Sequence, residues 1–387
     1  MQKLANRVAN IAPFQVMAIM ARAKHLQALG EDVIHLEVGE PDFIAPEAVN
    51  QAGAEAIAQG KTGYTAATGL PELRQAISKF YQSRYHVQVA PERIVVTPGA
   101  SGALLLLSSL MVNEGQEVLM PDPCYPCNRH FLAQVGARAR MLNCDASNNF
   151  EIPLEALDQE WDEHTAGVWL ASPANPTGSV LSQEYVSQIW QSVRRHEGHV
   201  LVDEIYQGLV FEGEDFTALS VSDDIFVINS FSKYFAMTGW RLGWIVVPEW
   251  AIDGATKLAQ NLFISAPAIS QHAAIRAFES DVLAECEVRR LELATRRKTL
   301  IKGLKRIGLP IASAPQGAFY IYVDVSGITE DAMAWSLRLL EEKHVAVTPG
   351  ADFGARDAHK YVRFAYTCDS HRLEMAIDRI ADFIAGY

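Results

Sequence analysis

The sequence lacks an apolar run long enough to span a membrane. The apolar stretch Ala103–Val112 has about half the length that a membrane-spanning helix requires. Residues 1–7 contain no apolar core of the kind that a secretory signal has. The sequence therefore predicts no membrane partner and no secretory signal.

Positive charge is also in short supply. The 387 residues include 33 Lys and Arg against 46 Asp and Glu, which gives a net charge of −13. This balance argues against nucleic acid or an anionic membrane as a partner. The five cysteines, an odd number, fit a reducing cytoplasm better than a disulfide framework. Cys124 and Cys127 have redox or half-zinc-site spacing, but no second pair completes a metal site, so we expect no metal.

The order of expected elements predicts an α/β protein. A chain of 387 residues exceeds the usual limit of one hydrophobic core, so we expect two domains. Strand-like runs alternate with stretches of helical periodicity, which favours a mostly parallel sheet covered by helices on both faces. After a long charged helix at about 280–307 the pattern changes to that of a smaller α+β domain. The strand-like runs lie at 93–97, 117–120, 166–171, 199–203, 225–230 and 243–247.

Lysine is scarce in the middle of the chain, where Lys233 is the only one between Phe80 and Thr256. Asp203 and Tyr206 precede this lysine, and Arg241 follows it by eight residues. A lone amine with a carboxylate, a phenol and a guanidinium can hold pyridoxal 5′-phosphate (PLP) as a Schiff base. The alternative for Lys233 taken alone is a solvated surface lysine.

A turn at residues 97–102 has the features of a phosphate site. It joins an expected strand to an expected helix, which places free backbone N–H groups and a positive dipole end at one point. Gly99 permits close backbone approach, and Ser101 adds a hydroxyl. Ser230 and Arg241 can complete the same site. Neither G-x-G-x-x-G nor the Walker pattern occurs here, so the turn alone is a weak signal.

Other polar residues suit a pyridine ring. Asp203, at the end of an apolar strand, can stay ionised and keep the ring nitrogen protonated; its alternative role is a helix cap. Tyr206 and Asn175 can hydrogen-bond the phenolic oxygen of the ring. Tyr125 can stack on the ring or be an ordinary packed aromatic. Two X-Pro bonds beside Asn175 favour a cis peptide in that turn.

The joint order of these residues resembles the class I/II aminotransferases of PLP fold type I, the aspartate aminotransferase superfamily, over essentially the whole chain. The resemblance implies a large PLP-binding domain at 46–288 with a mostly parallel seven-stranded sheet between helices. It also implies a small domain formed by 1–45 and 289–387. The matching residues are Gly39, Tyr64, Gly99, Ala100, Ser101, Tyr125, Asn175, Asp203, Tyr206, Ser230, Lys233, Arg241 and Arg363.

The resemblance also implies roles around the cofactor. Lys233 would be the Schiff-base lysine and would carry the proton between the substrate α-carbon and the cofactor. Asp203 would pair with the pyridine nitrogen, and Asn175 and Tyr206 with the phenolic oxygen. Tyr125 would stack on the ring. The phosphate would be held by Ala100, Ser101, Ser230 and Arg241, and by Tyr64 of the neighbouring subunit, which predicts a homodimer.

For the substrate, the resemblance implies that Arg363 binds the α-carboxylate with help from Gly39 and Asn175. The expected reaction is the transfer of an amino group from an L-amino acid to a 2-oxo acid, 2-oxoglutarate above all, by a ping-pong mechanism. Two other functions occur on this fold or near it. One is a PLP-dependent carbon–sulfur β-lyase, and the other is a regulator with an N-terminal DNA-binding module, for which no room precedes Gly39.

The side chain of the substrate is less well defined. The segment 260–267 has no arginine where the aspartate-specific branch has one, and Ser101 stands where another branch has a lysine. Both differences argue against a narrow preference for aspartate. Phe14, Phe263 and Ile264 suggest a pocket for neutral or aromatic side chains. Arg7 or Arg22 would be the cation that reaches a dicarboxylate.

Overall fold

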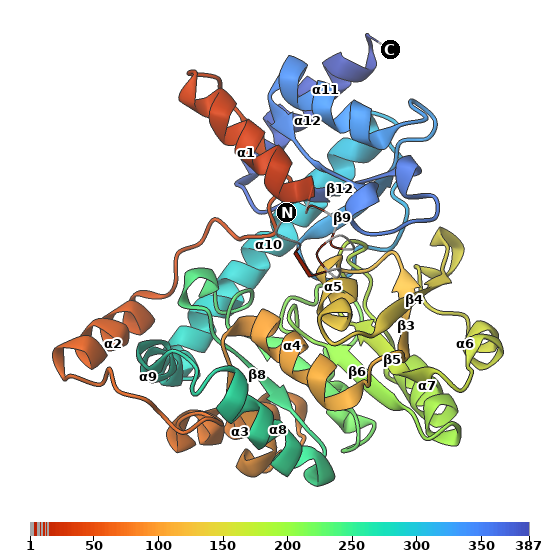
Figure 1. Ribbon diagram of the computed structural model, residues 1–387. Coiled ribbons are helices and arrows are strands. Elements are labelled where there is room, and N and C mark those ends of the chain that lie inside the picture. The colour runs from red at the N-terminus through yellow and green to blue at the C-terminus, as the bar shows by residue number, and fades with distance from the viewer. Residues whose placement is uncertain (1–3, 6–7, 9–10, 12, 14, 387) are drawn as a thin grey trace.

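The computed structural model describes residues 4–5, 8, 11, 13 and 15–386. The centre of its larger part is a seven-stranded sheet (Figure 1). β8 runs antiparallel to both of its neighbours, and the other pairs are parallel, so the predicted mostly parallel seven-stranded sheet is confirmed. In spatial order the strands are β2 (Ile94–Thr97), β8 (Gly243–Val246), β7 (Phe226–Ser230), β6 (His199–Asp203), β5 (Thr165–Ala171), β3 (Glu117–Asp122) and β4 (Arg138–Asn143).

β4 was not expected from the sequence. It lies at the edge of the sheet, where it pairs only with β3. Of its six residues only Leu142 is buried, and two are arginines. An edge strand needs no continuous apolar run, because one side of it faces solvent and charge there discourages pairing with other chains.

Helices cover both faces of this sheet because its strands alternate their side chains between two cores. In β6, Val200 and Val202 belong to one core, and Leu201 belongs to the other. The core of Leu201 contains helices α4 (Gly99–Met111), α5 (Cys127–Gln134) and α8 (Ile252–Leu262), and Figure 1 shows α4 and α8 in front of the sheet. The core of Val200 includes α2 (Glu47–Ala58), α3 (Pro71–Tyr85), α6 (Leu154–Glu160), α7 (Gln183–Arg195) and α9 (Ala268–Arg276).

A smaller α+β part follows the long helix α10 (Ser280–Arg306), which joins the two parts (Figure 1). Its antiparallel sheet has the order β11 (Thr348–Pro349), β12 (Tyr361–Ala365), β9 (Tyr320–Asp324), with helices α11 (Ala332–Lys343) and α12 (Ser370–Ile384). The N-terminal α1 (Gln15–Ala28) lies beside this part, and β1 (Ile34–His35) pairs with β10 (Val345–Ala346). Because α10 runs through residue 288 unbroken, the division at 46 and 288 stays a prediction.

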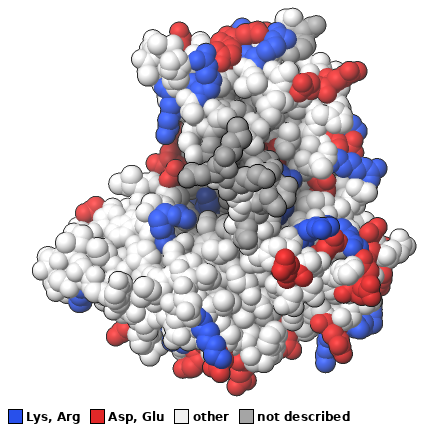
Figure 2. Space-filling view, in the orientation of Figure 1, with Lys and Arg blue, Asp and Glu red and all other residues white. Residues whose placement is uncertain are grey.

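The described surface carries both signs of charge. Figure 2 shows acidic and basic side chains interspersed at the margins of one face, and few of them over α2 and α4. Within residues 15–386, no helix combines the length and apolar character needed to cross a bilayer. No cluster of three or more His, Cys, Asp or Glu among the described residues is arranged to hold a metal.

Candidate active site

A cavity of about 480 Å³ lies where the carboxyl ends of β5, β6 and β7 approach the smaller part of the molecule. In a parallel sheet these ends share one edge, so residues far apart in the sequence meet there. The cavity brings together ten of the residues predicted to hold the cofactor or the substrate carboxylate, whereas Gly99, Ser230 and Tyr64 do not line it. Those that line it are Gly39, Ala100, Ser101, Tyr125, Asn175, Asp203, Tyr206, Lys233, Arg241 and Arg363.

Lys233 follows β7, and its side chain enters the cavity from the sheet edge. Its Nζ donates a hydrogen bond to the carbonyl oxygen of Gly39, at 2.5 Å. Burial lowers the pKa of Lys233 from 10.5 to about 8; the positive charges of Arg363 and Arg241 act in the same direction, and nearby carboxylates oppose them. An amine with this pKa is partly neutral near pH 8 and can therefore act as a nucleophile or a base.

Asp203 is the last residue of β6 and is buried. Its Oδ1 accepts a hydrogen bond from the backbone N–H of Ile205 at 3.0 Å. Burial raises the pKa of Asp203 to about 6, although this hydrogen bond and the charge of Lys233 favour the ionised form. A cationic group placed against this carboxylate would lower its pKa again. The residue is thus suited to bind a protonated ring nitrogen.

Arg363, in β12, closes the cavity from the side of the smaller part. It is buried; its Nη1 donates to Asn175 Oδ1 at 2.8 Å, and its Nη2 donates to the carbonyl oxygen of Glu37 at 2.5 Å. Its buried Nε has no hydrogen-bond partner, and the described residues offer it no carboxylate as an ion pair. A buried guanidinium without a counter-ion is a strong site for a carboxylate ligand.

The opposite end of the cavity has the properties of an anion cradle. Gly99 begins α4 with φ +71°, and a Cβ there would lie 2.7 Å from Arg241 Nη2. Only glycine therefore lets the first turn of α4 lie this close to the arginine. Arg241 is held by its Nη1, which donates to the carbonyl oxygen of Thr238 at 2.8 Å. Backbone N–H groups, a hydroxyl and a guanidinium at one point suit a phosphate.

Tyr206 and Asn175 lie between these two ends. Tyr206 is buried, with its hydroxyl 2.7 Å from that of Tyr320. Asn175 lies in the turn after β5, and the bonds Ser172–Pro173 and Asn175–Pro176 are both cis, which confirms the expectation of a cis peptide there.

Ser230 and Tyr64 lie outside the lining of the cavity. The buried Ser230 hydroxyl donates to the carbonyl oxygen of Leu242 at 3.1 Å and lies 3.0 Å from the hydroxyl of Ser232. Ser232 lines the cavity in its place. Tyr64 lies between α2 and α3 and is 84% exposed. A role for either residue in binding the cofactor stays a prediction.

Comparison with known proteins decides the family. The family model for aminotransferases of class I and II matches residues 31–380. The chain belongs to this family. It is 38% identical to valine–pyruvate aminotransferase of Mycobacterium tuberculosis over 97% of both chains. It is 36% identical to (5-formylfuran-3-yl)methyl phosphate transaminase of Methanocaldococcus jannaschii, over 98% of this chain and 99% of that one. A crystal structure of an aminotransferase from Mycobacterium tuberculosis matches all of both chains with a TM-score of 0.96 and 37% identity.

These matches confirm the predicted aminotransferase family and its PLP type I fold. The family depends on PLP, and the aminotransferase cavity fits that group. Lys233, Arg241 and Arg363 give it three cations against the carboxylates of Glu40 and Asp203, although the chain as a whole carries a charge of −13. A ligand with a phosphate, together with a substrate carboxylate, would balance this local excess of positive charge.

Several cavity residues of this aminotransferase were not found from the sequence. Tyr320 lies in the buried strand β9, where nothing in the sequence separates it from the other aromatics. Val16, Met17 and Met20 of α1 also line the cavity, and no sequence motif marked them. They became recognisable only when the fold brought α1 beside the sheet edge.

Of the residues expected to choose the substrate, those that the structure describes do not line the cavity. Arg22 is half-buried and donates two hydrogen bonds to Glu341 on α11, both at 2.6 Å. Phe263 and Ile264 do not line the cavity, and Ile264 is 55% exposed. Arg7 and Phe14 lie outside the described residues.

Proposed function

We propose that this aminotransferase moves the amino group of an L-amino acid to a 2-oxo acid, with 2-oxoglutarate as the acceptor, in two half-reactions of ping-pong order. The observation that carries the proposal is the environment of Lys233. Its amine has a pKa of about 8 and lines one cavity with a buried acid, Asp203, and a buried, unpaired arginine, Arg363. An amine of this kind between an acid and a carboxylate-binding group is what amino-group transfer requires.

Within this proposal, each part of the cavity holds one part of PLP. Lys233 would hold the aldehyde carbon, Asp203 the ring nitrogen, and Asn175 and Tyr206 the phenolic oxygen, while Tyr125 covers the ring. Gly99 and the first turn of α4 favour the phosphate end, where the contacts would come from Ala100, Ser101, Ser230 and Arg241. When bound, PLP supplies the electron sink that accepts the electron pair left by loss of the substrate α-proton.

The protein would position the substrate and move its proton. Arg363 would bind the α-carboxylate through its free Nε, with help from Gly39, while its Nη groups are held by Asn175 and by the backbone carbonyl of Glu37. Lys233 Nζ, which already contacts Gly39, would take the proton from the substrate α-carbon and deliver it to the carbon that was the aldehyde carbon of the cofactor. A lysine with a depressed pKa is suited to both steps, because its neutral and charged forms are close in free energy near pH 8.

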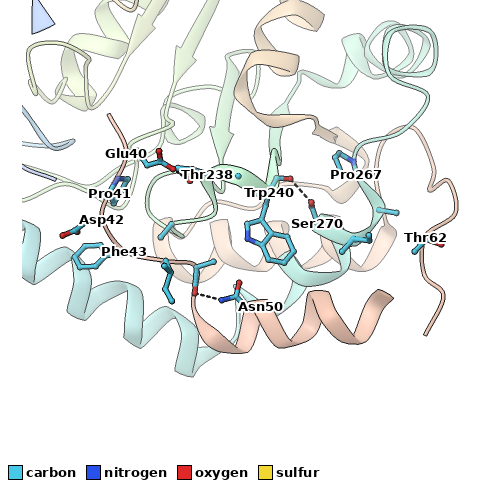
Figure 3. Close-up of a pocket in the computed structure, with 16 residues that line it drawn as sticks. Glu40, Pro41, Asp42, Phe43, Asn50, Thr62, Thr238, Trp240, Pro267 and Ser270 are labelled. Atoms are coloured by element: carbon cyan, nitrogen blue, oxygen red, sulfur yellow. Dashed lines mark hydrogen bonds between the residues drawn. The ribbon is translucent and has the colours of Figure 1, made fainter. Parts of the chain in front are cut away.

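We also propose a homodimer in which the partner subunit's Tyr64 reaches the phosphate end. An open groove of about 780 Å³ runs from this end to the surface between Glu40, Trp240, Pro267 and Ser270 (Figure 3). Glu40, Thr238 and Gly239 line both the groove and the cavity, so a segment of a second subunit in the groove would reach the site. Exposed apolar side chains on nearby segments support such a contact: Ile44, Ile57, Tyr64, Leu262 and Ile264.

Mixing two inactive variants tests the shared site. Lys233→Ala and Tyr64→Ala should each be impaired as homodimers. In a mixed dimer, the subunit that keeps Lys233 would receive an intact Tyr64 from its partner, so activity should return. Failure of mixed dimers to gain activity would contradict the shared site, provided that mass analysis of the intact complex shows that they form.

The reaction is tested by a half-reaction screen. Each amino acid is added to the PLP-loaded protein while the visible absorption of bound PLP is followed, and the 2-oxo acid and any sulfide are assayed in the same samples. We expect stoichiometric 2-oxo acid without a second substrate, and turnover once 2-oxoglutarate is added. Release of pyruvate and sulfide from cysteine or cystathionine would instead identify a carbon–sulfur β-lyase.

A reducing, cytoplasmic setting is the remaining part of the proposal. All five cysteines lie in the described part of the chain and are free thiols. Burial raises the pKa of Cys124 and of Cys144 to about 12, so neither is a reactive thiolate at neutral pH.

A further inference from the structure

Tyr320 makes contact with two functional residues of the cavity, Tyr206 and Arg363. It lies in β9, opposite Ala365 of β12, and is 1% exposed. Its hydroxyl contacts Tyr206, and its ring contacts Arg363. These two partners have separate roles in the proposed function, one toward the phenolic oxygen of PLP and one toward the substrate carboxylate. A side chain that touches both is in a position to orient both.

The hydroxyl contact restricts the directions in which the Tyr206 proton can point. The two phenolic oxygens are 2.7 Å apart, and the rings meet edge to face with their centroids 5.5 Å apart. On its other side, the Tyr320 hydroxyl is confined by Gly39, because a Cβ there would overlap it. If Tyr320 donates to Tyr206, the single proton of Tyr206 remains for a ligand oxygen in the cavity. Hydrogen bonds in such a chain strengthen one another.

The ring contact fixes the plane of Arg363. The guanidinium carbon lies 4.1 Å from the centroid of the Tyr320 ring and 4.8 Å from that of Phe353. Among the described residues, Arg363 makes no ion pair, and these aromatic faces add to its hydrogen bonds with two carbonyl-type oxygens and a hydroxyl. The Nε of Arg363, which has no hydrogen-bond partner, remains for a ligand.

We propose that Tyr320 is a positioning residue with two separable actions: its hydroxyl orients the Tyr206 hydroxyl toward PLP, and its ring holds Arg363 in the plane that receives the substrate carboxylate. The inference rests on the proposed function and adds a residue to it. It predicts that removal of the hydroxyl alone affects only the first action, whereas removal of the ring as well affects both.

Tyr320→Phe removes only the hydroxyl. Without the Tyr320 hydroxyl, Tyr206 would donate a weaker hydrogen bond to the phenolic oxygen of PLP. More negative charge would stay on that oxygen, so the proton between it and the lysine nitrogen would be held more tightly. The pH midpoint of the visible absorption change of bound PLP should therefore rise by about half a unit, the size expected for a fraction of one hydrogen bond. The dissociation constant of propionate, an unreactive carboxylate, should stay within twofold of that of the unsubstituted protein.

Tyr320→Leu removes the ring as well, and Phe353→Leu is its matched control. Tyr320→Leu should raise the pH midpoint of the absorption change, as Tyr320→Phe does. It should also weaken propionate binding about tenfold, the effect of losing one buried cation–π contact. Phe353→Leu should weaken propionate binding without moving the midpoint, because the contacts of Phe353 do not include Tyr206. Circular dichroism of each PLP-loaded variant shows whether it is folded.

An unchanged midpoint in Tyr320→Phe would overturn the first action, and this conservative variant should fold even if the leucine variants do not. Equal weakening of propionate binding by Tyr320→Phe and Tyr320→Leu would overturn the second. Failure of the proposed function looks different, because the unsubstituted protein would then bind PLP without forming 2-oxo acid, or would bind no PLP. The latter result would overturn both proposals.

Discussion

Capture of PLP by the cofactor-free protein should depend on pH, with a midpoint near 8. Only the neutral amine of Lys233 can attack an aldehyde. Burial lowers the pKa of this amine from 10.5 to about 8. At pH 7 a pKa of 8 leaves roughly 10% of the amine neutral, whereas a pKa of 10.5 leaves roughly 0.03%, so the buried lysine has about a 300-fold larger reactive fraction than an exposed one.

The assay mixes cofactor-free protein with PLP between pH 6 and 10 at constant ionic strength and follows the growth of the visible band. Two charge variants separate the local electrostatics from burial. Arg363→Gln removes a positive charge that lowers the pKa of Lys233, so its midpoint should rise. Glu40→Gln removes a negative charge that raises this pKa, so its midpoint should fall. Opposite shifts from two substitutions to the same residue type cannot come from a general loss of packing.

A rate that keeps rising to pH 10 without a plateau would refute the reasoning, because it would mean that Lys233 titrates like an exposed amine. N-acetyl-lysine mixed with PLP supplies that reference curve. Shifts of the same sign in Arg363→Gln and Glu40→Gln would show that the charges of the cavity do not set the pKa of the amine.

Three further substitutions test single residues. Lys233→Ala should lose the visible band of covalently held PLP and at least about three orders of magnitude in kcat, the contribution of a principal acid–base group; near-normal transamination would remove the central assignment. Asp203→Asn should bind PLP more weakly and turn over more slowly, and unchanged kinetics would show that Asp203 is only structural. Glu204→Gln concerns stability. Burial raises the pKa of Glu204 from 4.5 to about 8. Because the folded-state pKa is the higher one, the contribution of this group to stability is complete below pH 4.5 and is lost as the pH rises through 8. The Tm of the unsubstituted protein should therefore fall between pH 5 and 9 more steeply than that of Glu204→Gln, and equal slopes would contradict this.

Some of the cavity residues that the sequence predicted lie at or just after the end of an apolar strand. Asp203 closes β6, and Lys233 follows the end of β7. Such a residue lies at the carboxyl edge of a parallel sheet whatever the details of packing, so its position follows from topology alone. The edge strand β4 escaped prediction because its charged, half-exposed sequence lacks the buried strand's apolar run.

Residues whose role depends on side-chain contacts were not predictable in this way. Ser230 and Ser232 are two residues apart, and only the folded chain shows that Leu242 takes the hydrogen bond of Ser230 and leaves Ser232 at the cavity. Tyr320 is one of several aromatics in a buried strand, and its contacts with Tyr206 and Arg363 join segments more than 40 residues apart. Sequence patterns report burial and periodicity, but they do not report which buried side chains touch.

The cavity is electrostatically incomplete in the protein alone, and this ties cofactor binding to stability. Burial pushes Lys233 and Asp203 toward their neutral forms, and the buried Arg363 makes no ion pair with a described residue. A protonated ring nitrogen would favour ionised Asp203, and a phosphate would offset the positive charges near Lys233. A ligand that binds only the folded state also adds stability by mass action, about 2.7 kcal/mol at a hundredfold excess over its Kd. The buried charges that lower the stability of the cofactor-free protein therefore also make its cavity selective for a ligand with a basic ring, a phosphate and an adjacent carboxylate.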